Sequence, residues 1–138
     1  MRYKVGLVIR NKSYSLLLVK PIRNKKEREL GIYYTFPTLL VDEEESRDQA
    51  LRRLMDVLIV HQNPSLKELL SYESDDYEVD YFFVEGDFDI SKAFYEHFES
   101  FKYLHYQDFD SKNMADQDID EDALFIMDAI RDIVIENL

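Results

Sequence analysis

The chain contains no cysteine and no tryptophan, and it has only three glycines, three prolines and three histidines among 138 residues. The absence of cysteine excludes disulfide bonds, thiol nucleophiles and cysteine-based zinc or iron–sulfur sites. It also fits a reducing compartment, so we expect a cytoplasmic protein. So few glycines leave no glycine-rich phosphate-binding loop. His61, His97 and His105 are too far apart in the sequence to form a paired zinc motif.

Basic residues are scarce as well. The 17 Lys and Arg residues stand against 29 Asp and Glu residues, which gives a formal net charge of −12. This acidic balance argues against nucleic-acid binding, which depends on neutralising phosphates with a basic surface. No apolar run reaches the length of a membrane span, so we expect no membrane association. The length and the 46% of hydrophobic residues predict a single domain over residues 1–138 with its own core.

One group of basic residues lies in a short segment between two strand-like runs. Its members are Arg23, Lys25, Lys26 and Arg28. A segment of this kind either binds an anionic ligand or is an ordinary solvated loop, and both interpretations stay open. We take these four residues as candidates for ligand binding.

Hydrophobic patterning predicts strands, a central helix, more strands and a C-terminal helix. Runs of β-forming residues predict a hairpin at 3–9 and 14–19 and further strands at 32–36, 39–41, 79–84 and 98–106. Helical patterns predict a helix over 47–60 with Ser46 as its N-cap, short helical segments at 65–70 and 90–97, and a long helix over 118–138. This order of elements predicts an α+β fold.

The segment 36–53, with the sequence FPTLLVDEEESRDQALRR, joins an apolar–proline start, a short strand, an acidic loop and a helix. It resembles the catalytic box of the Nudix (MutT-like) hydrolase family, G-x5-E-x7-R-E-U-x-E-E-x-G-U, in which U is aliphatic. The resemblance implies a Nudix-like α/β/α sandwich with a mixed sheet between helices. It places Glu45 at the first glutamate of the box and Arg53 at the arginine.

Three acidic positions of the box are aliphatic in this chain, namely Leu54, Val57 and Leu58, and Leu39 replaces the opening glycine. In the family these acids hold Mg²⁺ or Mn²⁺, ions that prefer oxygen ligands. The metal promotes the attack of water on a diphosphate. Leucine and valine offer no oxygen, so Glu45 remains as a single candidate metal ligand. We therefore expect a degenerate catalytic site without a metal cofactor.

The replaced positions also widen the apolar face of the predicted helix. Together with Ala50, Leu51, Met55 and Ile59 they cover an arc of about 200°, whereas a helix buried on one side needs about 100°. Either other parts of the chain bury this surface, or it contacts a partner or an apolar ligand.

Three hypotheses about function remain open. The leading one is a Nudix-fold protein that binds a nucleotide-like or anionic ligand, or a protein partner such as a second copy, without hydrolysing a diphosphate. The second is a divergent hydrolase of nucleoside diphosphate-linked compounds that binds Mg²⁺ or Mn²⁺. Its metal ligands would come from Glu43, Glu44, Glu45, Glu85 or Glu99. The third is an accidental match to another small α+β domain.

Overall fold

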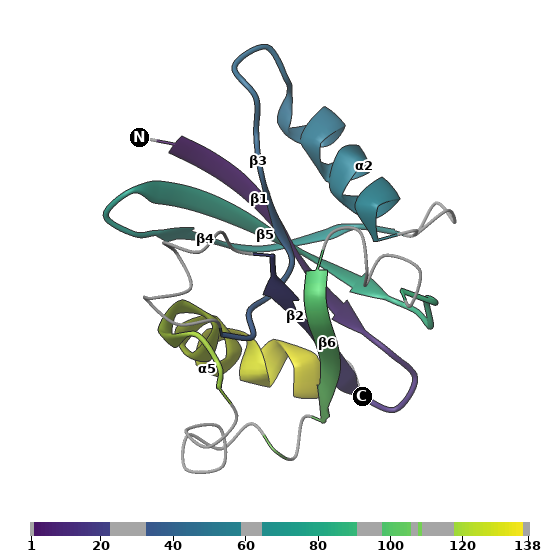
Figure 1. Ribbon diagram of the computed structural model, residues 1–138. Coiled ribbons are helices and arrows are strands. Elements are labelled where there is room, and N and C mark those ends of the chain that lie inside the picture. The colour runs from purple at the N-terminus through teal and green to yellow at the C-terminus, as the bar shows by residue number, and fades with distance from the viewer. Residues whose placement is uncertain are drawn as a thin grey trace.

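The computed structural model of the chain describes residues 2–22, 33–58, 65–90, 98–105, 108 and 118–136, the last four by their backbone alone. Its elements, in chain order, are β1 (Arg2–Arg10), β2 (Ser15–Pro21), β3 (Thr38–Leu40), α2 (Arg47–Val57), β4 (Lys67–Glu73), β5 (Tyr77–Glu85), β6 (Phe98–His105) and α5 (Glu121–Glu136). Figure 1 shows the strands crossing the centre of the molecule, with α2 and α5 on opposite sides of them. None of the helices in these ranges is long and apolar enough to cross a membrane.

The six strands form one mixed sheet with β1 near its centre. The strand order is β4-β5-β1-β2-β6, and β3 pairs with β1 outside this path. β1 and β5 are parallel over their whole length, and the other pairs are antiparallel. The first part of β1 pairs with β3, whereas its register with β2 is set at the far end, where Arg10 faces Leu16. β1 therefore joins a half that contains β4 and β5 to a half that contains β2 and β6.

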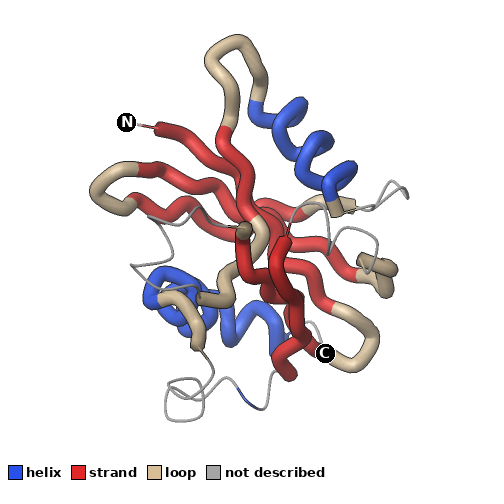
Figure 2. The backbone as a smooth tube through the Cα atoms, viewed as in Figure 1, coloured by secondary structure: helices blue, strands red, loops and turns tan. Residues whose placement is uncertain are grey.

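Each face of the sheet carries a hydrophobic cluster that is covered by one helix. On one face, Val5, Leu7, Ile9, Leu17, Phe82 and Val84 pack with Ala50, Leu51, Leu54 and Leu58 of the α2 region. On the other face, Val8, Leu16, Leu18, Phe36, Tyr81 and Phe83 pack with Ala123, Ile126, Met127 and Ile130 of α5. The predicted α/β/α sandwich is thus confirmed, and Figure 2 shows its two helical layers on either side of the strands.

Most predicted helices and strands are present in the structure, although their first and last residues differ from the prediction. The predicted helical segment at 65–70 is wrong, because β4 occupies this region and pairs with β5. Pairing with the buried strand β5 outweighs local helical preference there. In the run predicted at 32–36, Tyr34 and Thr35 form isolated bridges instead of a continuous strand. Residue 32, and residues 91–97 of the short helix predicted at 90–97, lie outside the described residues.

Helix α2 begins with a capping box and is held against the sheet by its aliphatic face. The Ser46 hydroxyl accepts a hydrogen bond from the Gln49 backbone N–H at 3.2 Å, and the Gln49 side chain accepts one from the Ser46 N–H at 2.9 Å. These bonds satisfy backbone donors that the first turn leaves free. Leu54 and Leu58 are 1% and 0% exposed, and Val57 is half-buried. The sheet therefore covers most of the wide apolar arc, as one of the two interpretations predicts.

We expect Leu58→Glu to lower the free energy of unfolding by about 3–5 kcal/mol, because it places a carboxylate without a partner in the core. Val57→Glu, on the same turn but half-buried, should cost clearly less. Urea unfolding of both variants beside the wild type measures the two losses. Equal losses would show that position 58 reaches solvent as easily as position 57.

Candidate functional site

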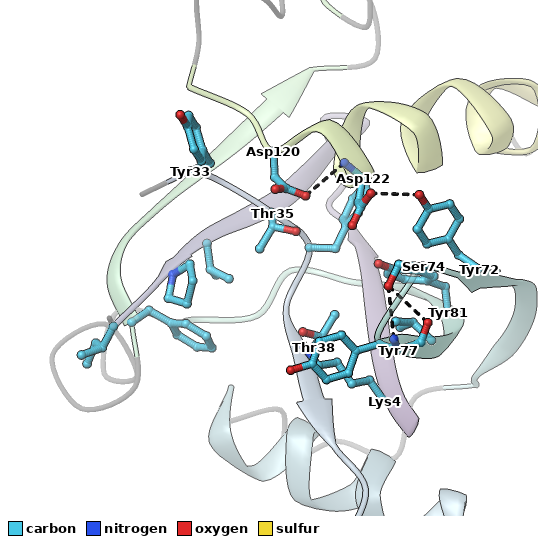
Figure 3. Close-up of a pocket in the computed structure, with 16 residues that line it drawn as sticks. Lys4, Tyr33, Thr35, Thr38, Tyr72, Ser74, Tyr77, Tyr81, Asp120 and Asp122 are labelled. Atoms are coloured by element: carbon cyan, nitrogen blue, oxygen red, sulfur yellow. Dashed lines mark hydrogen bonds between the residues drawn. The ribbon is translucent and has the colours of Figure 1, made fainter. Parts of the chain in front are cut away.

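A cavity of about 460 Å³ lies between the two halves of the sheet, next to the start of α5. One wall comes from β1, β3, β4 and β5, and the other comes from the end of β2, the start of β6 and the segment before β3. Asp120 and Asp122 close it at the start of α5. Figure 3 shows residues of these separate elements pointing into the same space. The volume lies in the range of sites for small organic molecules.

The lining of the cavity is rich in aromatic rings and hydroxyl groups. The rings belong to Tyr33, Phe36, Tyr72, Tyr77, Tyr81 and Phe98, and further hydroxyls belong to Thr35, Thr38 and Ser74. Aromatic faces stack on planar ligands, and the hydroxyls of tyrosine, threonine and serine donate or accept hydrogen bonds. The cavity can therefore hold a planar ring and fix its orientation through polar contacts.

Charged side chains stand at two ends of this cavity (Figure 3). At one end, the Lys4 ammonium lies 3.9 Å from the centre of the Tyr77 ring, a cation–π contact that holds the positive charge at the wall. At the other end, Asp122 accepts a hydrogen bond of 2.9 Å from the Tyr72 hydroxyl. This hydrogen bond raises the pKa of the Tyr72 phenol. The cavity thus presents a positive group at one end and the carboxylates of Asp120 and Asp122 at the other.

The basic residues predicted to bind a ligand, Arg23, Lys25, Lys26 and Arg28, lie outside the described residues. The described chain stops at Ile22 and resumes at Tyr33, and both of these residues line the cavity. Their side chains are 55% and 45% exposed.

The structure brings together Glu45 and Arg53, the two residues that match charged positions of the Nudix box. Arg53 donates from Nε and Nη2 to the two carboxylate oxygens of Glu45, at 3.0 and 2.8 Å. The same Nη2 donates to the Leu40 carbonyl at 2.8 Å, and the Asp42 N–H donates to Glu45 at 3.2 Å. The hydrogen bonds from Arg53 lower the pKa of Glu45. Both oxygens of Glu45 thus serve to tie α2 to the end of β3 and to the loop between them.

Two of the three aliphatic positions of the box lie in a hydrocarbon cluster, and the third, Val57, is half-buried. Leu54 and Leu58 belong to the buried cluster under α2, and Leu39, at the position of the opening glycine, packs against it. Apolar side chains therefore occupy the space beside α2 where the box would carry carboxylates. Among the residues that the structure describes, no group of three His, Asp or Glu side chains is placed to hold a metal ion.

The other acids that could have rebuilt a metal site are spread over several elements. Glu43 and Glu44 are exposed in the loop before α2. Glu85, at the end of β5, forms an ion pair of 2.7 Å with the buried Arg10. Glu99 lies on β6, the edge strand beside β2. Glu43 and Glu44 thus share a loop with Glu45, whereas Glu85 and Glu99 belong to strands.

Neither the cavity nor the role of Asp80 was predicted from the sequence. The cavity residues are far apart in the chain, so no local motif joins them. Asp80 stands out only as a polar residue inside an apolar strand, yet it is 8% exposed and accepts hydrogen bonds from Tyr3, Ser71 and Arg47. Burial raises the pKa of this carboxyl. Asp80 thereby links the first residue of α2 to β1, β4 and β5.

No protein-family model and no curated protein matches the sequence. Among solved structures, a mutT/nudix family protein from Listeria innocua superposes with a TM-score of 0.71 at 13% identity, over 99% of this chain and 95% of its own. A MutT NUDIX hydrolase from Burkholderia pseudomallei gives 0.66 at 14% identity, over 94% and 97%. A NUDIX hydrolase from Nitrosomonas europaea gives 0.62 at 17% identity, over 98% and 89%. These likenesses confirm the predicted fold and contradict the hypothesis that the chain has another α+β fold.

The lowered pKa of Glu45 predicts a specific dependence of stability on pH. A carboxyl whose pKa falls on folding stabilises the protein above its unfolded value, here 4.5, and this stabilisation is lost as the pH falls through the folded pKa. We expect Glu45→Gln to be less stable than the wild type at neutral pH, with a difference that shrinks as the pH drops below 4.5.

Urea unfolding at a series of pH values measures this difference. Glu44→Gln is the matched control, because Glu44 is an exposed neighbour in the same loop. We expect that variant to follow the wild type throughout. A loss in Glu45→Gln that does not change with pH would contradict the assignment of the lowered pKa to this ion pair.

Proposed function

We propose that this Nudix-fold chain binds a small nucleotide-like ligand in the aromatic cavity and does not hydrolyse diphosphates. Two observations support this proposal. The chain has a cavity of about 460 Å³, and Leu54, Val57 and Leu58 offer no side-chain oxygen that could bind a metal ion. The cavity retains groups for recognition. The helix lacks the groups that would position a metal ion and a reacting water.

The distribution of groups in the cavity supports a ligand with a planar ring and an anionic group. The ring would stack among the tyrosine and phenylalanine side chains. Its N–H donors would face Asp120 and Asp122, which accept hydrogen bonds and repel phosphate. The anionic group would then point toward Lys4 at the opposite end of the cavity. A nucleotide combines these features in one molecule.

The state of Glu45 supports the absence of catalysis. Its two carboxylate oxygens already accept hydrogen bonds from the Arg53 guanidinium. Mg²⁺ prefers six oxygen ligands in octahedral geometry, usually with several waters and one or two carboxylates. The neighbouring Leu54 and Leu58 cannot complete such a site, and Glu45 acts as a structural residue in this proposal.

A divergent metal-dependent hydrolase is the competing function. The observation that favours it is the acidic loop before α2, where Asp42, Glu43 and Glu44 are exposed beside Glu45. In that case the loop, and not the helix, would supply the oxygen ligands. The exposed side chains of such a loop lack the fixed orientation that catalysis requires, so we rank this function second.

We expect no release of phosphate or nucleoside monophosphate when the protein is incubated with Mg²⁺ or Mn²⁺ and a panel of nucleoside diphosphate-linked compounds. The physical reason is the lack of a metal to polarise the diphosphate and orient water. Glu45→Gln, purified in the same way, reports contaminating hydrolases. Metal-dependent turnover by the wild type that disappears in this variant would overturn the proposal in favour of the competing function.

We expect isothermal titration with nucleosides and nucleotides to detect binding, and Tyr33→Leu to weaken it by about 1–3 kcal/mol through the loss of ring stacking. Tyr33 is 45% exposed, so its replacement should leave the fold intact. Phe125→Leu is the matched control, because Phe125 is 59% exposed and does not line the cavity. Equal affinity of the wild type and Tyr33→Leu would place the ligand elsewhere.

A further inference from the structure

A second surface lies on the outer side of α5, with Phe125 at its centre. Phe125 is 59% exposed, more than any other large apolar side chain in the described ranges. Its neighbours in sequence Ala123, Ile126 and Met127 are almost completely buried. Phe125 therefore points away from the core that the rest of the helix covers, and the core does not explain its aromatic side chain.

Phe125 forms an aromatic pair with Tyr72 of β4. The ring centres are 5.2 Å apart and the ring planes are inclined by 41°. The Tyr72 hydroxyl donates to Asp122, one turn before Phe125 on α5. Tyr72 lies on β4, which stands at one edge of the sheet among the described residues. The pair thus spans a helix and an edge strand, whose outer backbone groups can accept an extended segment of another chain.

Carboxylates surround this aromatic pair. Glu121, Asp122 and Asp128 stand three or four residues from Phe125, which places them next to it on the helix surface, and all three are exposed. The charges of Asp75 and Asp120 also act on the Tyr72 hydroxyl. An exposed single apolar residue is common on protein surfaces. A pair of rings within a group of carboxylates is a more specific arrangement.

We propose that Phe125, Tyr72 and the carboxylates of Asp122 and Asp128 form a docking surface for a basic segment of a protein partner. An arginine or lysine side chain of that segment would stack on the exposed ring and pair with the carboxylates. Its backbone would lie along the edge of β4. This surface shares Tyr72 and Asp122 with the proposed ligand cavity and extends beyond it to Phe125 and Asp128.

The carboxylates and the exposed ring favour a basic segment over other partners. The negative face of an aromatic ring attracts cations, and carboxylates form charge-assisted hydrogen bonds with guanidinium groups. A second copy of this chain carries the same net charge of −12 and would be repelled, as would an anionic membrane. Tyr72 and Asp122 also line the cavity, whereas Phe125 does not. Phe125 is therefore the residue that separates the two sites in an experiment.

The test is fluorescence anisotropy with a labelled oligo-arginine peptide, and an oligo-glutamate peptide serves as the negative probe. We expect the full chain to bind the oligo-arginine peptide and Phe125→Ala to weaken binding about fivefold or more, although it changes no charge. Asp128→Asn should also weaken binding. Glu43→Gln is its matched control, because it removes the same charge from an exposed position in the loop before α2.

Two results would overturn the proposal. Equal affinity of the wild type and Phe125→Ala, or an equal loss in Asp128→Asn and Glu43→Gln, would mean that the peptide responds to net charge alone. Sedimentation that shows a dimer abolished by Phe125→Ala would assign the surface to a second copy of the chain. An unchanged melting temperature of Phe125→Ala, expected from its exposure, ensures that lost binding is not lost folding.

Discussion

The packing of Leu54 and Leu58 against the sheet is the contact on which the position of α2 depends. Both side chains lie in the hydrophobic cluster that α2 shares with β1, β2 and β5. Burial of two leucines contributes about 1.5–3 kcal/mol each relative to exposed side chains. A carboxylate at either position would need a metal ion, a charged partner or water next to it, because a buried charge without a partner is unfavourable. The hydrophobic packing of α2 and the lack of side-chain oxygens at positions 54 and 58 therefore have the same cause.

Glu45 and Arg53, the two residues that match the Nudix box, have a structural role. Glu45 and Arg53 form a bidentate ion pair that also reaches the carbonyl of Leu40. This pair holds the loop between β3 and α2, while Asp80 holds the first residue of α2, Arg47, from the other side. The helix is thus fixed at its start by polar groups and along its length by aliphatic ones.

The proposed cavity and the proposed docking surface share two residues. The hydrogen bond between Tyr72 and Asp122 lies at the boundary, with Phe125 on one side and the cavity on the other. A partner that draws Asp122 toward its own cation would remove the acceptor from Tyr72. Because any coupling between two sites is reciprocal, a ligand in the cavity would then affect the partner to the same extent. The acidic surface and the aromatic cavity are in this sense parts of one region around the start of α5.

The sandwich with its mixed sheet was implied by the resemblance of segment 36–53 to the Nudix box. The amino-acid sequence by itself determined the α+β class, the two long helices, the capped start of α2 and the aliphatic character of positions 54, 57 and 58. These features follow from local periodicity and from residue chemistry at fixed spacing, which one segment of chain contains completely. The tertiary structure alone decided that 67–73 is a strand, since the pairing partner β5 lies outside that segment. It also decided the cavity, because Lys4, Tyr77 and Asp122 become neighbours only when the sheet halves and α5 assemble. Contacts between distant segments leave no local pattern in a single sequence, and that is the physical reason for the difference.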